Sequence, residues 1–220
     1  MIKPDEIIRS NRKTLAIAID PFGRLIVRAP KTCSLERIFH FISQKEQWIL
    51  QKQAQMAGAG MRLPPEDLNG YVFMLLGKEC EIILTDKRNV LFDEKNYTLY
   101  LPTKNAKQRL IKWLKENAKR IFTIVTERKA QEMGVSFQSV ELSSAKGKWG
   151  SCSYDNKIRY VYRLIYAPRE IIEYVVVHEL SHVKHKNHSK AFWAEVAKHE
   201  QNWKEKRKWL KTHGYLLELF

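Results

Sequence analysis

Alternating apolar and polar positions dominate the N-terminal part of the chain. Residues 14–20 (TLAIAID) and 24–30 (RLIVRAP) flank a Pro-Phe-Gly sequence, a pattern that predicts a β-hairpin. Ser34 is suited to begin a helix that continues to about Met56, because apolar residues recur there at helical spacing. Short alternating runs between residues 71 and 102 then predict a small antiparallel sheet.

Helical periodicity replaces this alternation after Pro102. The segment from about Asn105 to Met133 carries apolar residues on one side and basic residues on the other, and Gly134 suits its end. Two runs of strand-like composition follow, FQSVELSS and KIRYVYRLIY, and Pro168 is suited to begin another helix. Further helices are expected near the C-terminus, at about 189–199 and 202–213. Because strands and helices are segregated without βαβ alternation, the sequence predicts an α+β fold.

The change of pattern places a boundary near Pro102. We expect residues 1–102 to form a β-rich N-terminal part with one helix, and residues 103–220 to form the part that carries the chemistry. A chain of 220 residues is long enough for one sizeable domain, or for one domain with a small appendage.

Composition narrows the class of protein. With 44% hydrophobic and 29% charged residues, the chain is typical of soluble globular proteins. No segment approaches the roughly 18 unbroken apolar residues of a membrane span, and the N-terminus lacks the apolar core of a signal peptide. The cysteines Cys33, Cys80 and Cys152 are widely separated and form no CxxC pair, which favours a reducing cytoplasm over a disulfide framework.

The formal net charge of +15 is compatible with two interpretations. A positive field would favour polyanions such as nucleic acid, nucleotides or acidic protein segments. A solvated, lysine-rich surface explains the charge equally well. Charge alone therefore does not define a partner.

The segment His178–His182 (HELSH) carries the clearest chemistry. A spacing of four positions places both histidine rings on one face of a helix, about one turn apart, where both can reach one metal ion. Glu179 would project beside that ion and can take a proton from water activated by zinc. HExxH is a short motif, so a histidine pair without a metal is the alternative interpretation.

A catalytic zinc ion usually has three protein ligands and one open position. His188 is the best-placed third ligand. The polar residues around Asn187 can end the helix and turn the chain back, and Ser189 can cap the next helix.

Two other sources of a third ligand are weaker. His185 shares a helix face with His178, but the axial rise carries it about 4.5 Å beyond His182, away from the midpoint of the pair. Glu195 or Glu200 on the following helix would give a His/His/Glu site instead.

Two separated motifs resemble those of the YgjP-like metal-dependent hydrolases, which are related to SprT-like and WLM zinc peptidases. They are KGKWGSCS and, downstream, VVVHELSHVKHKNHSKAFW, which contains HELSH, Asn-His-Ser and Phe-Trp in order. The resemblance covers essentially the whole of residues 103–220. It implies a zincin-like metallopeptidase domain with Zn2+ ligands His178, His182 and His188 and the catalytic glutamate Glu179.

The segment Lys148–Ser153 (KWGSCS) allows two interpretations. It is either an exposed strand edge that aligns an extended substrate, with Gly150 permitting close approach, or a buried strand that packs Trp149 against the metal-binding helix. Cys152 is not favoured as a nucleophile or ligand, because no companion thiol lies nearby in the sequence.

Basic and aromatic residues surround these motifs. If several of the lysines face the cleft, the substrate is anionic, although solvated helix-end charge is the simpler explanation. The lysines concerned are Lys146, Lys148, Lys184, Lys186 and Lys190. In the basic C-terminal segment, Trp203 and Trp209 are six positions apart and do not share a helix face for stacking with nucleic acid.

Three functions remain compatible with the sequence. The leading hypothesis is a zinc metallopeptidase-like hydrolase acting on peptide or protein, with Tyr160, Tyr162 or a lysine near Lys148 as unranked stabilisers of the oxyanion. The second is a metal-dependent phosphohydrolase (a pyrophosphatase) acting on nucleotides, which the positive net charge of the chain favours. The third is a DNA-associated protein in which zinc is a structural element.

Overall fold

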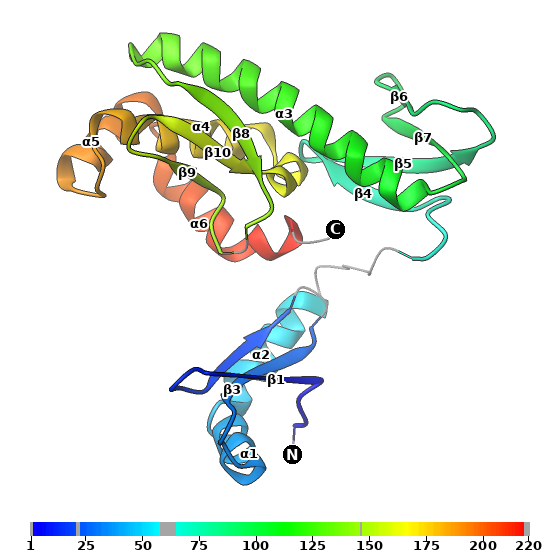
Figure 1. The fold of residues 1–220 in the computed structure, drawn as a ribbon, viewed down its shortest axis with the longest axis vertical. Helices are drawn as coiled ribbons and strands as arrows, with labels where there is room; N and C mark the ends of the chain where they lie inside the picture. Colours follow the sequence, from blue (N-terminus) through cyan, green and yellow to red (C-terminus); the bar gives the residue numbers. More distant parts are fainter. Residues whose placement is uncertain (1, 21–22, 58–64, 146, 218–220) are drawn as a thin grey trace. The chain divides into compact units, whose positions relative to one another are not determined.

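The computed structural model describes residues 2–20, 23–57, 65–145 and 147–217 of the chain (Figure 1). The chain forms two compact units, which meet in the sequence at Leu63 and Pro64. Strands and helices are segregated in both units, so the predicted α+β class is confirmed. Within the described ranges, no helix combines the length and the apolar character that a membrane crossing requires.

The first unit is a three-stranded sheet with two helices. Its strands are β1 (Glu6–Ser10), β2 (Ala16–Ile19) and β3 (Leu25–Pro30), in the order β1-β3-β2. The antiparallel pair β2–β3 is the predicted hairpin, although residues 21 and 22 of its turn lie outside the described part. Alternate side chains of β3 are buried against residues of the two helices, and together they form the core of this unit: Leu25, Val27, Ala29, Ile38, Ile42 and Ile49.

The expected single helix after Ser34 is two helices, α1 (Leu35–Gln44) and α2 (Glu46–Ala57). The Ser34 side chain accepts a hydrogen bond from the N–H of Arg37, as expected of a helix N-cap. Lys45 interrupts the helix with φ −112° and ψ 10°, and its N–H bonds back to the carbonyl of Ile42. This short 3₁₀-type contact ends α1 and changes the direction of the chain.

The second unit begins with a four-stranded sheet in the order β4-β5-β7-β6. The strands are β4 (Val72–Leu75), β5 (Lys78–Thr85), β6 (Leu91–Asp93) and β7 (Thr98–Pro102). The expectation of an antiparallel sheet between residues 71 and 102 is wrong for one pair, because β5 is parallel to β7. The strand β1, which the sequence pattern did not predict, is likewise parallel to β3. In each case the chain crosses to the far edge of the sheet and returns through a hairpin, which inserts the returning strand beside a strand of the same direction.

The long helix α3 (Ala106–Met133) runs along the second unit, as predicted (Figure 1). Gly134 ends this helix in the left-handed conformation.

The second sheet of this unit has the order β8-β10-β9. Its strands are β8 (Ser139–Ser143), β9 (Gly150–Cys152) and β10 (Lys157–Val161). The 3₁₀ turn η1 (Tyr162–Tyr166) then leads into the C-terminal helices. These are α4 (Arg169–Lys184), α5 (Lys190–His199), α6 (Trp203–His213) and the short η2 (Gly214–Leu217).

The division at Leu63 falls earlier in the chain than the boundary expected near Pro102. The sheet β4-β5-β7-β6 packs with the helical part, since β7 contacts α3 and β4 contacts η1. A backbone hydrogen bond of 2.8 Å from the N–H of Leu76 to the carbonyl of Ile165 joins the β4–β5 turn to η1. These contacts place residues 65–102 in the same unit as α4.

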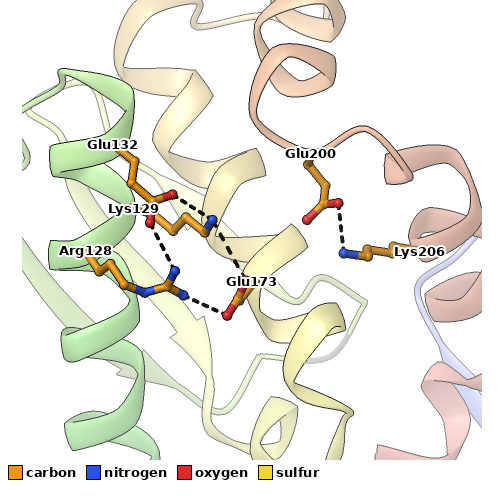
Figure 2. A network of polar contacts seen from close by, with 6 residues as sticks. All are labelled: Arg128, Lys129, Glu132, Glu173, Glu200 and Lys206. Atoms are coloured by element: carbon orange, nitrogen blue, oxygen red, sulfur yellow. Dashed lines mark hydrogen bonds and ion pairs between the residues drawn. The ribbon is translucent and has the colours of Figure 1, made fainter.

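Ion pairs fix α4 against α3 (Figure 2). Arg128 of α3 contacts Glu173 of α4 at 2.7 Å, and Lys129 lies 3.9 Å from the same carboxylate. Both cations also contact Glu132, which links the charges into a network. Beneath this network the apolar side of α4 is buried, including Val176, Val177 and Leu180, so the helix is held in a fixed position.

Candidate metal centre

Helix α4 presents His178 and His182 on one face, as the four-residue spacing predicts. Their ring centroids are 5.2 Å apart. The side chain of His188 approaches from beyond the end of the helix, and its Nε2 atom lies 3.1 Å from Nε2 of His178. One ring nitrogen from each of the three histidines lies within 4.8 Å of the others.

A sharp turn between α4 and α5 brings His188 back to the face of α4. His185 ends α4 with φ −132° and ψ 100°, an extended conformation that stops the helix. Ser189 then begins α5, and its side chain accepts a hydrogen bond from the N–H of Phe192 at 3.3 Å. The polar residues between the helices therefore reverse the chain at the point that the sequence predicted.

The three imidazoles fit a metal ion of tetrahedral preference. In a tetrahedral zinc site with bond lengths of about 2.0–2.1 Å, two nitrogen ligands lie about 3.3 Å apart, close to the 3.1 Å between His178 and His188. The His185 carbonyl lies 3.0 Å from Nδ1 of His182. A carbonyl can only accept, so Nδ1 donates and Nε2 of His182 is left free to coordinate.

His178 has the protonation state that a ligand needs. Burial, together with the positive charge that His182 and His188 can carry, lowers its pKa from 6.5 to about 3. The imidazole is therefore neutral near pH 7, which is the form that binds metal. Its Nδ1 atom is buried and has no hydrogen-bond partner among the described residues.

Aromatic side chains from α5 enclose the histidines. The Phe192 ring is fully buried, with its centroid 4.4 Å from His182 and 4.9 Å from His178. The indole of Trp193 stacks on His188, with a centroid distance of 5.8 Å and an interplanar angle of 29°. These contacts restrict ring rotation and so hold the three nitrogens in place.

Glu179 is buried beside this cluster, with 5% of its surface exposed. Burial raises the pKa of its carboxyl from 4.5 to about 8, and the nearby ammonium group of Lys148 opposes this shift. The backbone of β9 lies directly against it: a β-carbon built on Gly150 would stand 2.5 Å from Oε1 of Glu179 and 2.7 Å from its Cγ. Only a residue without a side chain fits here while the glutamate keeps this position.

Residues 13–213 match the family model of the YgjP-like metallopeptidase domain. The chain belongs to the YgjP-like family. The resemblance seen in the sequence motifs is thereby confirmed, and the His178/His182/His188 cluster lies within the matched segment.

Two solved structures are similar to parts of this YgjP-like chain. One is the metallopeptidase zymogen abylysin of Pyrococcus abyssi, with 24% identity, a TM-score of 0.37, and coverage of 41% of this chain and 93% of that one. The other is the metallopeptidase zymogen jannalysin of Methanocaldococcus jannaschii, with 20% identity, a TM-score of 0.35, and coverage of 40% and 90%. A comparison with curated proteins gave no match.

The other ligands considered from the sequence lie in different contacts in the YgjP-like chain. The carboxylate of Glu195 pairs with Lys184 at 2.7 Å, and that of Glu200 pairs with Lys206 at 2.8 Å (Figure 2). His185 contributes its backbone carbonyl to His182 and is not part of the histidine cluster.

A cleft of about 590 Å³ opens over the histidines of this YgjP-like chain. Residues Lys148–Cys152 form one wall, so the segment lies beside the cleft as the first interpretation of KWGSCS expected. The indole of Trp149 also packs against Gly214, at the end of α6. Burial raises the pKa of the Cys152 thiol, which disfavours the thiolate that a nucleophile or ligand requires.

Sequence reasoning missed a second group of residues that line the cleft. It consists of Arg207, Leu210 and Lys211 of α6, which share one helix face at spacings of three and four. Tyr174 also lines the cleft, and a signal for it existed, because it lies one turn before His178 on the same face of α4. Burial raises the pKa of its hydroxyl to about 12, so it is a hydrogen-bond donor at neutral pH.

Some of the tyrosines and lysines that the sequence suggested as cleft residues line the cleft, and others make contacts elsewhere. The hydroxyl of Tyr160 lies 3.1 Å from that of Thr126 in the protein interior, and Tyr162 is buried as well. Lys148 and Lys186 line the cleft, whereas Lys184 binds Glu195. Lys190 is not among the lining residues, and Lys146 lies outside the described part of the chain.

Proposed function

We propose that this YgjP-like chain is a zinc-dependent metallopeptidase. His178, His182 and His188 would hold the ion, and Glu179 would be the catalytic base. The observation that carries the proposal is the placement of a buried carboxylate next to three convergent imidazoles at the floor of an open cleft. A structural zinc site is normally closed by four protein ligands, whereas three ligands beside a cleft are typical of a catalytic one.

Zinc, when bound, supplies a Lewis acid that lowers the pKa of water towards about 7 and polarises a carbonyl group. The positive charge of a bound ion would favour the carboxylate form of Glu179 and so oppose the effect of burial on its pKa. Glu179 can then accept the proton of the attacking water and pass it to the leaving nitrogen of the amide. Gly150 keeps the carboxylate in position, because its backbone fills the space beside it. Tyr174 lines the same cleft and can donate a hydrogen bond to the carbonyl oxygen of the substrate.

The strand β9 is suited to bind the substrate backbone. Its hydrogen bonds go to β10 on one side, and among the described residues its other edge is unpaired. An extended peptide can add to such an edge through main-chain hydrogen bonds.

We place the reaction in the cytoplasm, because Cys33, Cys80 and Cys152 are all free thiols.

A single substitution tests the catalytic role. Glu179→Gln should retain zinc but lower the hydrolysis of a casein-type protein substrate by about 10²–10⁴-fold, since general-base catalysis contributes on that order. Metal content by elemental analysis and initial rates on the metal-loaded protein are the measurements. Glu170→Gln, an exposed position on the same helix, is the matched control and should leave both unchanged.

Retained hydrolysis in metal-loaded Glu179→Gln would contradict the mechanism.

A second candidate function, a metal-dependent phosphohydrolase, is favoured by the cationic side chains that line the cleft. Assaying a nucleoside triphosphate panel beside the protein substrate, with the metal varied, separates the two.

A further inference from the structure

The cleft over the histidine cluster has a marked imbalance of charge. Its described lining includes four cationic side chains, namely Lys148, Lys186, Arg207 and Lys211, and one carboxylate, that of Glu179. None of the four cations forms an ion pair with a carboxylate of the described residues. All four are exposed, so their charge is presented to whatever enters the cleft.

Two of these cations lie at opposite ends of β9. Lys148 precedes Gly150 by two residues. The Nζ atom of Lys186 lies 3.1 Å from the carbonyl of Ser153, directly after the strand, and 2.6 Å from Oδ1 of Asn156. Because Gly150 contacts Glu179, it marks the point on β9 nearest the proposed catalytic base. Lys148 comes two residues before that point, and Ser153, the residue that Lys186 contacts, comes three residues after it. For an extended backbone with about 3.3 Å per residue, these spacings correspond to roughly 7 and 10 Å.

The other two cations lie on α6, which also lines the cleft. Arg207 and Lys211 are one helical turn apart and share the face that lines the cleft. The guanidinium group of Arg207 sits over the indole of Trp193, 4.8 Å from its centroid. That indole stacks on His188, so the chain of ring contacts fixes Arg207 relative to the histidine cluster.

We propose that the cleft selects an extended peptide with acidic side chains two or three residues to either side of the cleaved bond. This inference rests on the peptidase function proposed above. The distribution of the cations favours a peptide over a polyphosphate, because they come from separate places, the two ends of β9 and one face of α6. A phosphate-binding site needs its cations and backbone N–H groups to converge on one point.

The contribution of each cation should be modest, because all are exposed and hydrated. An exposed ion pair changes affinity by about two- to fivefold, and salt weakens it. The preference should therefore appear in kcat/KM at low ionic strength and should decline as salt is added.

The test compares matched peptides that have Glu, Gln or Lys at the flanking positions around one common cleavage sequence. Rates are measured with the zinc-loaded protein, and dissociation constants with zinc-loaded Glu179→Gln. We expect kcat/KM and affinity to fall in the order Glu, Gln, Lys. On the Glu179→Gln background, where the effect of Lys148 on the pKa of Glu179 is absent, the double variant Lys148→Glu/Lys211→Glu should weaken binding of the Glu peptide by about tenfold. Lys208→Glu on the same background makes the same charge change as Lys211→Glu at a position of α6 outside the cleft lining and should have little effect.

Each other outcome overturns the inference in a recognisable way. Equal cleavage of the three peptides, or an equal loss in Lys208→Glu, would show a peptidase without this selectivity. Tighter binding of a nucleoside triphosphate than of the Glu peptide, with turnover of the nucleotide alone, would assign the cations to a polyphosphate. No cleavage of any peptide or protein by the zinc-loaded protein would remove the proposed function itself.

Discussion

The two three-stranded sheets of this protein, β1-β3-β2 and β8-β10-β9, share one pairing pattern. Each has a central strand with a parallel neighbour on one side and an antiparallel neighbour on the other. In the first sheet, β3 buries alternate apolar residues against α1 and α2. In the second, the edge strand β9 lies against α4 through Gly150 and meets the carboxylate of Glu179.

This difference shows that strand order does not determine where a site forms. Among the described residues, the one group of three metal-ligating side chains lies beside the second sheet. What distinguishes that sheet is a glycine on its edge strand and a helix whose polar face approaches it. Equivalent changes in the two regions should therefore have different consequences.

The largest expected effect is on the metal. His182→Ala removes one of three ligands, so zinc affinity should fall by more than the roughly 10–100-fold that loss of a supporting hydrogen bond costs. Hydrolysis should fall to background with it. His40→Ala on α1 is the control beside the first sheet, where the ring is exposed and contacts Gln44. Zinc titration of both variants measures the difference, and equal zinc loss in His40→Ala would refute the localisation of the site.

The next effect should be on stability alone. Leu25→Ala removes a fully buried side chain from β3 and should lower the free energy of unfolding by about 2–5 kcal/mol. Zinc affinity should be unchanged, because Leu25 belongs to the core of the first unit. Leu35→Ala, at a position with 53% exposure, is the control for a small change. Denaturant unfolding and zinc titration are both required, and weaker zinc binding in folded Leu25→Ala would show that the two regions are coupled.

A smaller and more specific effect is expected at the edge of the second sheet. Gly150→Ala should lower kcat by about 10²-fold through displacement of the Glu179 carboxylate, since a shift of about 1 Å can cost that much. Zinc content should be retained, because the added β-carbon would meet Glu179 first and Glu179 is not one of the three clustered histidines. Ser151→Ala, the next residue on β9, is the matched control. A purely structural role for Gly150 would instead appear as a loss of zinc or of folded protein, with kcat per folded molecule unchanged.

The sequence was a good guide where one local rule decided the geometry. HELSH places two rings on one helix face, and Ser189 begins α5 where a cap was expected. The hairpin, α3 and the last two helices also follow from local periodicity and capping. These features depend on residues that are close together in the chain.

Features that depend on distant residues were predicted less well. The parallel pairing of β5 with β7 is decided by the path of the chain between them, which alternation in either strand does not encode. Likewise, nothing in the sequence of α6 indicates that Arg207 and Lys211 line the same cleft as β9. The close contact between Gly150 and Glu179 has no signature in either motif alone.

That contact also constrains how the protein can diverge. While position 179 is a glutamate held in this place, every mutation of Gly150 adds a β-carbon where the carboxylate stands. A shorter acid at 179 would relieve the collision but would move the proton acceptor. The two positions, 29 apart in the sequence, are therefore expected to change together in descendants or not at all. A single substitution at either position is expected to lower activity, because it displaces or removes the Glu179 carboxylate.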